Sequence, residues 1–320
     1  MISIAIDAMG GDHAPKQIVE GAVLAQKENP GLFKLFLCGP QDIIAAELKR
    51  LNYTASDIEV FHAPDIVGMD ESPAAVLKTK PNSSLVACVA LQKKGVVQAS
   101  VSAGNSGAMM AACLMLLGRV GNISRPAIAC NIPAKKPLVM LDMGANVDEK
   151  PQVLVDFATC GSIYAEKSFQ LENPRVGLLN MGEEENKGPD VIQETYQLLK
   201  NSPLNFVGNI EARDIFSGNA DVIVTSGYTG NVVLKLIEGF YELHFETFGV
   251  IDSESGRDFQ EKWDYRNHGG ALLLGLKGTG VIAHGCSDAK AISTAISYAH
   301  GFAKNKIAES IAERYTGEQA

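Results

Sequence analysis

Short apolar runs alternate with longer amphipathic segments along most of the chain. The runs are rich in β-branched and aromatic residues and many end in Gly or Asp, which is typical of strands that lead into turns. Few of them alternate between apolar and polar positions, as expected for strands covered on both faces. We predict strands over residues 3–7, 32–39, 58–64, 99–104, 126–133, 138–144, 176–182, 204–210, 221–227 and 280–285.

The segments between these runs have helical patterns. We expect helices after Pro15, after Gln41, and over residues 83–94, 105–117, 151–168 and 289–313. Strands that alternate with helices indicate a parallel sheet with helices on both sides. The predicted fold class is therefore α/β, a Rossmann-like α/β/α sandwich with a mostly parallel central sheet, built as a single catalytic domain over residues 1–320.

Residues 229–266 interrupt this alternation and predict a pair of helices. The first helix carries an apolar stripe opposite a row of glutamates, and the second, from about Gly256, folds back. We interpret the stripe as a dimer interface or a core helix; the alternative is that the tip near Phe248, Val250 and Ile251 also contacts a membrane surface. The stripe contains Leu236, Ile237, Phe240, Leu243, His244 and Phe248.

Composition narrows the possible functions. With 46% hydrophobic and 20% charged residues, the sequence of 320 residues predicts a globular protein. The net charge of −9 argues against general nucleic-acid binding, which needs clustered Lys and Arg. No apolar run is long enough to span a bilayer, and the first residues predict a strand rather than a signal peptide. The six cysteines are widely spaced, which favours reduced thiols in the cytoplasm over disulfides.

Six small polar turns follow predicted strands, at the end of a sheet where open α/β folds bind ligands. Glycine allows a ligand to approach the backbone closely, and a helix N-terminus offers unpaired N–H groups. Such turns can bind an anion with little formal positive charge, although each turn alone could be only a capped helix start. The turns are "DAMGGD" (7–12), "SAGNSGA" (102–108), "DMGANVD" (142–148), "NMGEEENKG" (180–188), "TSGYTGN" (225–231) and "HGCSD" (284–288).

Familiar catalytic motifs are missing from the sequence. It has neither a Walker A motif nor an intact G-x-G-x-x-G after the first strand, and no G-x-S-x-G elbow. His13 and His284 lack the spacing of metal ligands, so we expect no metal and no cofactor. A nucleophilic role for Cys286 is a minor alternative to a small side chain that shapes its turn.

Seven motifs together resemble one enzyme family over nearly the whole chain. They resemble the bacterial acyl-acyl-carrier-protein:phosphate acyltransferases of phospholipid synthesis. The departures from the family pattern are Ser226 in place of Asp, Ser106 in place of Thr and Cys286 in place of Ser. The motifs are "DAMGGDHAP", "SAGNSGA", "DMGAN", "LLNMGEEENKG", "TGNVVLK", "GGALLLGLKG" and "HGCSDAKA".

The resemblance implies transfer of a long-chain fatty acyl group from acyl carrier protein to inorganic phosphate, without a cofactor. The acyl phosphate would then pass to a membrane-bound glycerol-3-phosphate acyltransferase. It also implies a fold similar to phosphate acetyltransferases and isocitrate-dehydrogenase-like proteins. A homodimer formed through a protruding helical pair, placed here at residues 229–266, and peripheral contact with the inner face of the cell membrane are further implications.

The resemblance places catalytic positions at Lys187 and Asn231, and His284 is a candidate proton donor to the leaving thiolate or a structural cap. Because phosphate is the nucleophile, the site needs hydrogen-bond donors more than acids. Acidic side chains at strand ends would repel phosphate, so we interpret Asp7, Asp12 and Asp142 as loop anchors or caps. The expected phosphate- and substrate-binding residues are Gly10, Gly11, Asp12, His13, Asn105, Ser106, Asn146, Gly230 and Ser287.

The acidic carrier protein needs a local basic patch on this acidic chain. Arg257, Lys262 and Arg266 are the candidates for docking, and a solvated helix face is the alternative. Two other functions stay open: a phosphate acyltransferase of short-chain coenzyme A esters, and a non-catalytic membrane-associated scaffold for lipid synthesis. A nicotinamide-dependent dehydrogenase is a more distant alternative.

Overall fold

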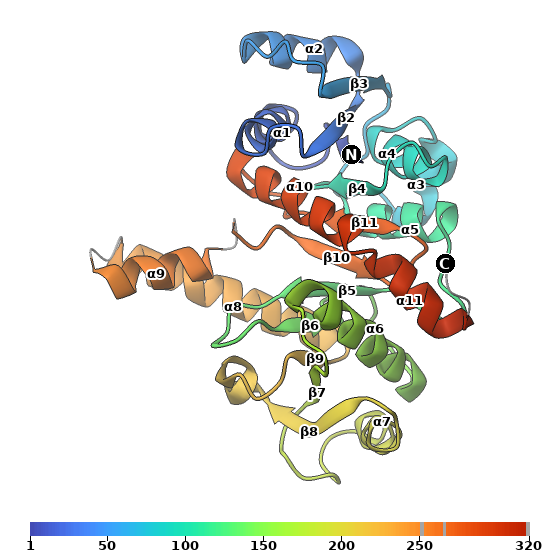
Figure 1. The fold of residues 1–320 in the computed structure, drawn as a ribbon, viewed down its shortest axis with the longest axis vertical. Coiled ribbons are helices and arrows are strands. Elements are labelled where there is room, and N and C mark those ends of the chain that lie inside the picture. Colours follow the sequence, from blue (N-terminus) through green and yellow to red (C-terminus); the bar gives the residue numbers. More distant parts are fainter. Residues whose placement is uncertain (250–252, 265–266, 318–320) are drawn as a thin grey trace. The chain divides into compact units, whose positions relative to one another are not determined.

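The computed structural model describes residues 1–249, 253–264 and 267–317. The chain forms two compact units, each made of two segments. The first contains Met1–Gly118 and Tyr265–Glu309, and the second contains Arg119–Asp264 and Ser310–Ala320. Figure 1 shows a sheet flanked by helices in each unit, as the α/β prediction requires. The expectation of a single catalytic domain stays a prediction.

The sheet of the first unit is parallel except for its last strand. Its strand order is β3 (Ile58–His62), β2 (Phe33–Gly39), β1 (Ile2–Asp7), β4 (Ala99–Ser102), β11 (Thr279–Ile282) and β10 (Ala271–Leu274), with β10 antiparallel to β11. Ile4, Ile6, Leu35 and Leu37 on the central strands are at most 1% exposed, because helices cover both faces of this sheet.

Helices α1 (Lys16–Glu28) and α10 (Ala289–Lys304) pack closely against each other in the first unit. A Cβ on Gly21 would lie 2.5 Å from Cβ of Ile292, so glycine permits this approach. The other helices of the unit are α2 (Gln41–Arg50), α3 (Pro73–Thr79), α4 (Ser84–Lys93) and α5 (Ser106–Leu116). Helix α11 (Ile307–Thr316) begins in this unit and ends in the second.

The second unit repeats this organisation with shorter strands. Its sheet has the order β5 (Ala127–Asn131), β6 (Val139–Leu141), β9 (Val222–Val224), β7 (Arg175–Asn180) and β8 (Asn205–Glu211), with β5 antiparallel to β6 and the others parallel. Its helices are α6 (Pro151–Phe169), α7 (Asp190–Lys200), α8 (Gly227–Phe248) and α9 (Glu254–Trp263), with a 3₁₀ helix η1 (Ala212–Ser217) after β8.

A bidentate ion pair joins β7 to the start of β9. Arg175 donates from Nη2 to Oδ1 of Asp221 at 2.7 Å and from Nε to Oδ2 at 3.0 Å. Burial alone would raise the pKa of Asp221, but the hydrogen bonds and charge of Arg175 outweigh it, and the pKa is lowered. Asp221 therefore stays ionised in the fold, and its share of the stability is present above the unfolded-state pKa and lost as the pH falls through the lower folded-state value.

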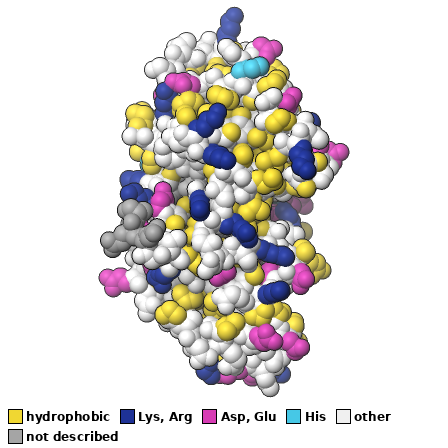
Figure 2. Space-filling view, turned by 90° about the vertical axis from the view of Figure 1, so that its right-hand side faces the viewer, with side chains coloured by type: hydrophobic (Ala, Val, Ile, Leu, Met, Phe, Trp, Pro, Cys, Tyr) yellow, Lys and Arg dark blue, Asp and Glu magenta, His cyan; other side chains and the backbone are white. Residues whose placement is uncertain are grey.

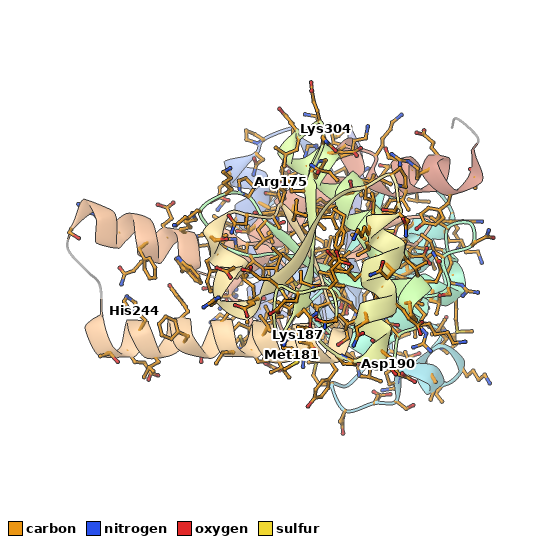
Figure 3. The ribbon with its side chains drawn as sticks, turned by 90° about the horizontal axis from the view of Figure 1, so that it is seen from below. Arg175, Met181, Lys187, Asp190, His244 and Lys304 are labelled. Carbon is orange, nitrogen blue, oxygen red and sulfur yellow. The ribbon has the colours of Figure 1, made fainter. Side chains whose placement is uncertain are left out.

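The predicted helical pair is confirmed as α8 and α9. The two helices lie side by side (Figures 1 and 3), and the ring of His244 is 5.2 Å from that of Phe259. Near their far end, Gln260 donates a hydrogen bond to the carbonyl of Gly249. Along α8 an apolar stripe is solvent-exposed, and we call Tyr228, Val232, Leu236, Phe240 and Leu243 the α8 stripe. The predicted tip residues Val250 and Ile251 lie outside the described residues.

Three features depart from the sequence prediction. Strand β10 was not predicted, because its short run lies between glycines with positive φ at Gly269, Gly270 and Gly275 and lacks the length of a buried strand. The helix expected over residues 289–313 is instead α10 and α11, since Lys306 has a φ of 52° and ends the helical path. Helices α3 and α7 were also not predicted.

No helix in the described part of the chain is both long enough and apolar enough to cross a membrane. Figure 2 shows Lys and Arg side chains interspersed with apolar ones on one face, although the net charge is −9.

Candidate functional site

In the first unit, three polar turns meet at the carboxyl edge of the sheet. Strands β1, β4 and β11 are parallel neighbours, so the chain leaves each of them at the same edge. We call residues 7–12, 102–106 and 283–288 the first turn cluster. In it the Asp12 N–H donates to the carbonyl of Gly285 at 2.8 Å, which joins two turns that are far apart in sequence.

Glycine is required where these turns touch. A Cβ on Gly10 would lie 2.4 Å from Oδ2 of Asp7 and 2.8 Å from the Gly104 nitrogen. Gly11 has a φ of +106°, and its Cβ would lie 3.1 Å from the Gly285 carbonyl oxygen. The backbone of the 7–12 turn therefore approaches the other two turns too closely for a side chain to fit between them.

Asp7 anchors this arrangement, as its position at a strand end suggested. The register pairs Ile6 with Val101, so Asp7 lies beside Ser102, whose hydroxyl donates to Oδ2 of Asp7 at 2.7 Å. The Met9 N–H donates to Oδ1 at 3.3 Å. Burial raises the pKa of Asp7 although these hydrogen bonds favour the charged form. The interpretation of Asp7 as a loop anchor is confirmed.

The Asn105 side chain is already occupied by hydrogen bonds within the first unit. Its Oδ1 accepts from the Ala108 N–H at 2.9 Å and caps α5. Its Nδ2 donates to the carbonyl oxygens of Gly68, Met69 and Glu71, at 3.3, 3.0 and 2.9 Å. Any contact of Asn105 with a ligand would compete with these bonds. Ser106 is the first residue of α5 and is exposed.

The turn after β11 presents polar side chains of different exposure. His284 and Cys286 are exposed, whereas Ser287 is 3% exposed and its N–H donates to the carbonyl of His284 at 3.0 Å. Asp288 caps α10 by accepting from the Ala291 N–H at 2.9 Å. Asp12 and His13 are exposed beyond the Gly10–Gly11 turn.

In the second unit, the loop after β6 is organised by Asp142, which is fully buried. Its Oδ1 accepts from the N–H groups of Ile128 and Ala145 at 2.9 and 3.1 Å. Its Oδ2 accepts from the backbone and side-chain nitrogens of Asn146, both at 2.8 Å. Burial raises the pKa of Asp142 in spite of these four bonds. Asp142 is thus a loop anchor, as interpreted from the sequence, and the Asn146 side chain helps to hold it.

The first turn of α8 packs directly on this loop. We call residues 142–146 and 225–231 the second turn cluster. A Cβ on Gly230 would lie 1.9 Å from the Asp142 carbonyl oxygen, and one on Gly227 would lie 2.1 Å from that of Asn146. Gly144 faces Asn231 with a φ of +124°, and its Cβ would lie 3.3 Å from that of Asn231. The structure therefore brings together Asn146, Gly230 and the exposed Asn231.

Two side chains cap the start of α8, and the sequence alone did not predict either cap. Ser226 Oγ accepts from the Thr229 N–H at 3.2 Å. The buried Glu149 accepts from the Gly227 N–H at 2.8 Å. An acidic side chain 78 positions away, with no motif around it, offered no signal for this contact.

Lys187 lies in the loop between β7 and α7, at the carboxyl edge of the same parallel strands. The loop is held by Asn180, whose Nδ2 donates to the carbonyl of Lys187 at 3.0 Å. The Lys187 side chain is exposed and forms no ion pair with any described residue. Figure 3 labels Lys187 close to Met181, which follows β7, and also labels Asp190, the first residue of α7.

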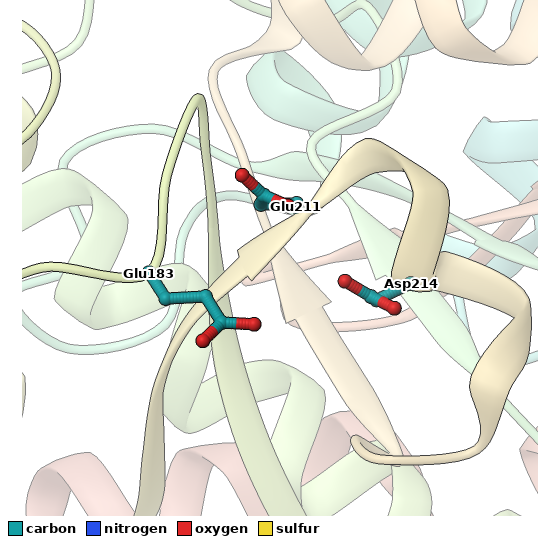
Figure 4. Close-up of side chains that lie close together, drawn as sticks. All are labelled: Glu183, Glu211 and Asp214. Carbon is teal, nitrogen blue, oxygen red and sulfur yellow. The ribbon is translucent and has the colours of Figure 1, made fainter.

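An acidic group lies at the end of β8, shown in Figure 4. One carboxylate oxygen of each of Glu183, Glu211 and Asp214 lies within 4.8 Å of the others. Arg213 already pairs with Glu211 at 2.6 Å and approaches Asp214 at 3.6 Å. The arginine offsets part of this negative charge, so the close approach of the three carboxylates does not require a metal ion.

The predicted docking residues are only partly described. Arg257 and Lys262 are exposed on α9, and Arg266 lies outside the described residues.

Comparisons with known proteins give a consistent result. Residues 2–310 match the family model described as "Fatty acid synthesis protein". Proteins named "Phosphate acyltransferase" from Dictyoglomus turgidum and Alkaliphilus oremlandii are 43% and 44% identical to this chain. Both alignments cover 98% of this chain and 97% of the relative.

The solved structures that resemble this chain are more distant and show the fold. A phosphotransacetylase from Streptococcus pyogenes has a TM-score of 0.66 at 16% identity, covering 95% of this chain and 94% of the other. A branched-chain phosphotransacylase from Enterococcus faecalis has a TM-score of 0.61 at 17% identity, covering 95% and 99%. The family match and the full-length relatives together show that this chain belongs to the fatty acid synthesis protein family, whose members named above are phosphate acyltransferases.

Proposed function

We propose that this chain transfers a long-chain fatty acyl group from acyl-acyl carrier protein to inorganic phosphate, giving acyl phosphate for glycerophospholipid synthesis. The observation that carries the proposal is 43–44% identity over nearly the full length to proteins named phosphate acyltransferase. The polar turns at the carboxyl edges of both sheets support it, because open α/β sheets bind their ligands at that edge.

The proposed reaction is a direct displacement. A phosphate oxygen attacks the thioester carbonyl, the new C–O bond forms, and the C–S bond breaks to release the carrier thiolate, which takes up a proton. Lys187 offsets phosphate charge, and Asn231 donates to phosphate or to the developing oxyanion. Donors placed in advance where charge develops are worth roughly 3–4 kcal/mol each in other acyl transfers. His284 is a candidate proton donor to the thiolate. The other predicted substrate-binding positions remain candidates, and a ligand contact of the Asn105 side chain would have to replace its bonds to the 68–71 loop.

The experiment that tests this function is thiol release from palmitoyl-acyl carrier protein by the purified protein. We expect release that depends on inorganic phosphate and yields one acyl phosphate per thiol, trapped with hydroxylamine as the hydroxamate. Release without phosphate would indicate a thioesterase, and no release would favour the scaffold. A preference for acetyl-coenzyme A would favour the short-chain alternative.

We propose that the acidic carrier protein docks at the basic side chains of α9. Reversing Arg257 and Lys262 to Glu should raise KM for palmitoyl-acyl carrier protein about tenfold, because close charges across an interface set its affinity. Palmitoyl-coenzyme A should be used within about twofold of wild type. Reversal of the exposed Arg50 in the first unit is the control. Equal losses on both substrates would contradict the docking role.

We propose that the α8 stripe is covered by a second copy of this chain in a homodimer. Tyr228, Leu236 and Phe240 are 66%, 71% and 61% exposed, and a row of large apolar side chains at helical spacing is unusual for a free surface. A Leu236→Glu variant should sediment as a monomer, whereas wild type sediments as a dimer. A wild-type monomer at micromolar concentration would overturn this proposal.

Peripheral attachment to the inner face of the cell membrane, where the downstream glycerol-3-phosphate acyltransferase would take the product, is part of the same proposal. Acyl phosphate carries a long apolar chain, so release next to a bilayer would favour its transfer. Flotation of the wild-type protein with anionic vesicles is the measurement, and a wild-type protein that does not float with the vesicles would contradict the attachment.

A further inference from the structure

Cys286 and His284 form a thiol–imidazole pair on the exposed turn after β11. The Cys286 sulfur lies 3.0 Å from Nδ1 of His284, within hydrogen-bond range for sulfur. The Cys286 N–H also points to Nδ1, at 3.4 Å. The backbone N–H can only donate, so Nδ1 is the acceptor in that contact and lies where it can also accept the thiol hydrogen.

The other five cysteines are shielded from reagents. Cys38, Cys88, Cys113 and Cys160 are buried, Cys130 is partly buried, and Cys286 alone is exposed. Burial raises the pKa of Cys113 and of Cys130 to about 12, so these thiols stay protonated and unreactive at neutral pH. All six cysteines lie in the described part of the chain.

The surroundings of the pair belong to the first turn cluster. The carbonyl of Gly285, between the two side chains, accepts the Asp12 N–H at 2.8 Å. A Cβ at Gly285 would lie 3.3 Å from Cε of Met69, which marks how closely the 68–71 loop approaches this turn. The turn that carries the exposed sulfur is therefore in contact with the rest of the first turn cluster.

We propose that Cys286 and His284 form a reactive-thiol site that is modified by peroxides and other soft electrophiles. His284 Nδ1 takes the thiol proton, and the thiolate attacks one peroxide oxygen. An S–O bond forms and the O–O bond breaks; sulfur is oxidised to a sulfenic acid, and the departing hydroxide takes the proton from His284 to give water. The balance is one thiol and one hydrogen peroxide to one sulfenic acid and one water.

The reactive thiol is the new site. The effect that its oxidation has on activity rests on the proposed function. An added oxygen or a mixed disulfide next to Gly285 would enter the first turn cluster, so we expect oxidation to lower phosphate-dependent thiol release. Cys286→Ser removes the thiol, so peroxide treatment should not lower the activity that this variant has before treatment. The chemical labelling below does not depend on any activity.

The test measures labelling of intact protein by iodoacetamide, and by hydrogen peroxide followed by dimedone, with peptide mapping of every cysteine. Wild-type Cys286 should react at least about tenfold faster than the same cysteine in a synthetic peptide of residues 280–290, and the buried cysteines should not react in that time. His284→Gln and His284→Asn should slow Cys286 labelling about tenfold, and His62→Gln, an exposed histidine on β3, should not.

Two results would overturn the proposal. The first is a wild-type rate equal to that of the peptide, which would make Cys286 an ordinary exposed thiol. The second is an unchanged rate in both His284 variants, with the fold verified by thermal melting. If labelling behaves as expected but acyltransferase activity is absent from the start, the proposed function fails and the reactive thiol stands.

Discussion

A Gly230→Ala variant should lose about 100-fold in kcat/KM for acyl transfer and about 3 kcal/mol in the free energy of unfolding. The added Cβ would lie 1.9 Å from the Asp142 carbonyl oxygen, 3.0 Å from the carbonyl carbon and 3.0 Å from Cγ2 of Thr225. Two of these three atoms are backbone, so no rotamer change can relieve the clash. Helix α8 must move away from the loop after β6, and overpacking of this kind costs a few kcal/mol.

The activity should fall more than stability alone explains, because the displaced helix carries Asn231. Gly230 and Asn231 are adjacent, and Asn231 lies against Gly144 in the loop that Asp142 holds. A shift of about 1 Å in a catalytic group can cost about 100-fold. The measurement is kcat and KM for phosphate, with chemical denaturation of the same sample.

Gly239→Ala is the matched control for this substitution. It lies on the same helix, and a Cβ there meets no atom within 4 Å. Alanine is the better helix former by about 1 kcal/mol, so this variant should be as stable as wild type or more so, with unchanged activity. Equal activity in the two variants would contradict the role that we assign to the contact between α8 and the β6 loop.

The edge of the sheet could be predicted from the sequence because the signal is local. Asp7 and Asp142 each follow an apolar run and precede a turn that contains Met and Gly. In a parallel sheet the carboxyl ends of all strands lie at one edge, so these two patterns predict which edge carries the turns. The interpretation of both as anchors needed only the argument that a carboxylate repels phosphate. The structure adds which donors hold each carboxylate, and the Asp142 donors come from Ile128 on β5 as well as from its own loop.

The contacts that the sequence did not reveal are non-local. Asn105 was interpreted as a helix cap or a ligand, and its Nδ2 instead also holds the loop at Gly68, Met69 and Glu71, which no pattern near residue 105 encodes. The contact between Glu149 and the N–H of Gly227 at the start of α8 is likewise encoded by no pattern near either residue. Strand β10 is a short antiparallel strand between glycines, so a rule that looks for long apolar runs does not predict it.

Lys187 differs from Lys200, the lysine at the other end of α7, in having no ion pair with any described residue. Lys200, on α7 of the same unit, pairs with Glu185 at 2.7 Å, although Glu185 belongs to the same loop as Lys187. The nearby Glu211 and Asp214 are paired with Arg213. Three of the nearby acids, Glu185, Glu211 and Asp214, are thus engaged by other cations, and Lys187 forms no ion pair with a described residue, so we expect its charge to act on an anion at the carboxyl edge of the sheet.

Lys187→Ala should therefore lower kcat/KM for phosphate about 100-fold, mainly through a higher KM for phosphate, because the ammonium offsets phosphate charge on binding. Lys187→Arg should recover part of the loss, since it keeps the charge but not the shape. The free energy of unfolding should change by less than about 0.5 kcal/mol, because the side chain is exposed. Lys200→Ala is the control and should keep its KM within about twofold. The measurement is thiol release as a function of phosphate concentration. An unchanged KM for phosphate in Lys187→Ala would contradict a role of this residue in the proposed phosphate site. Asn231 and the glycine turns would then be the groups that hold the anion.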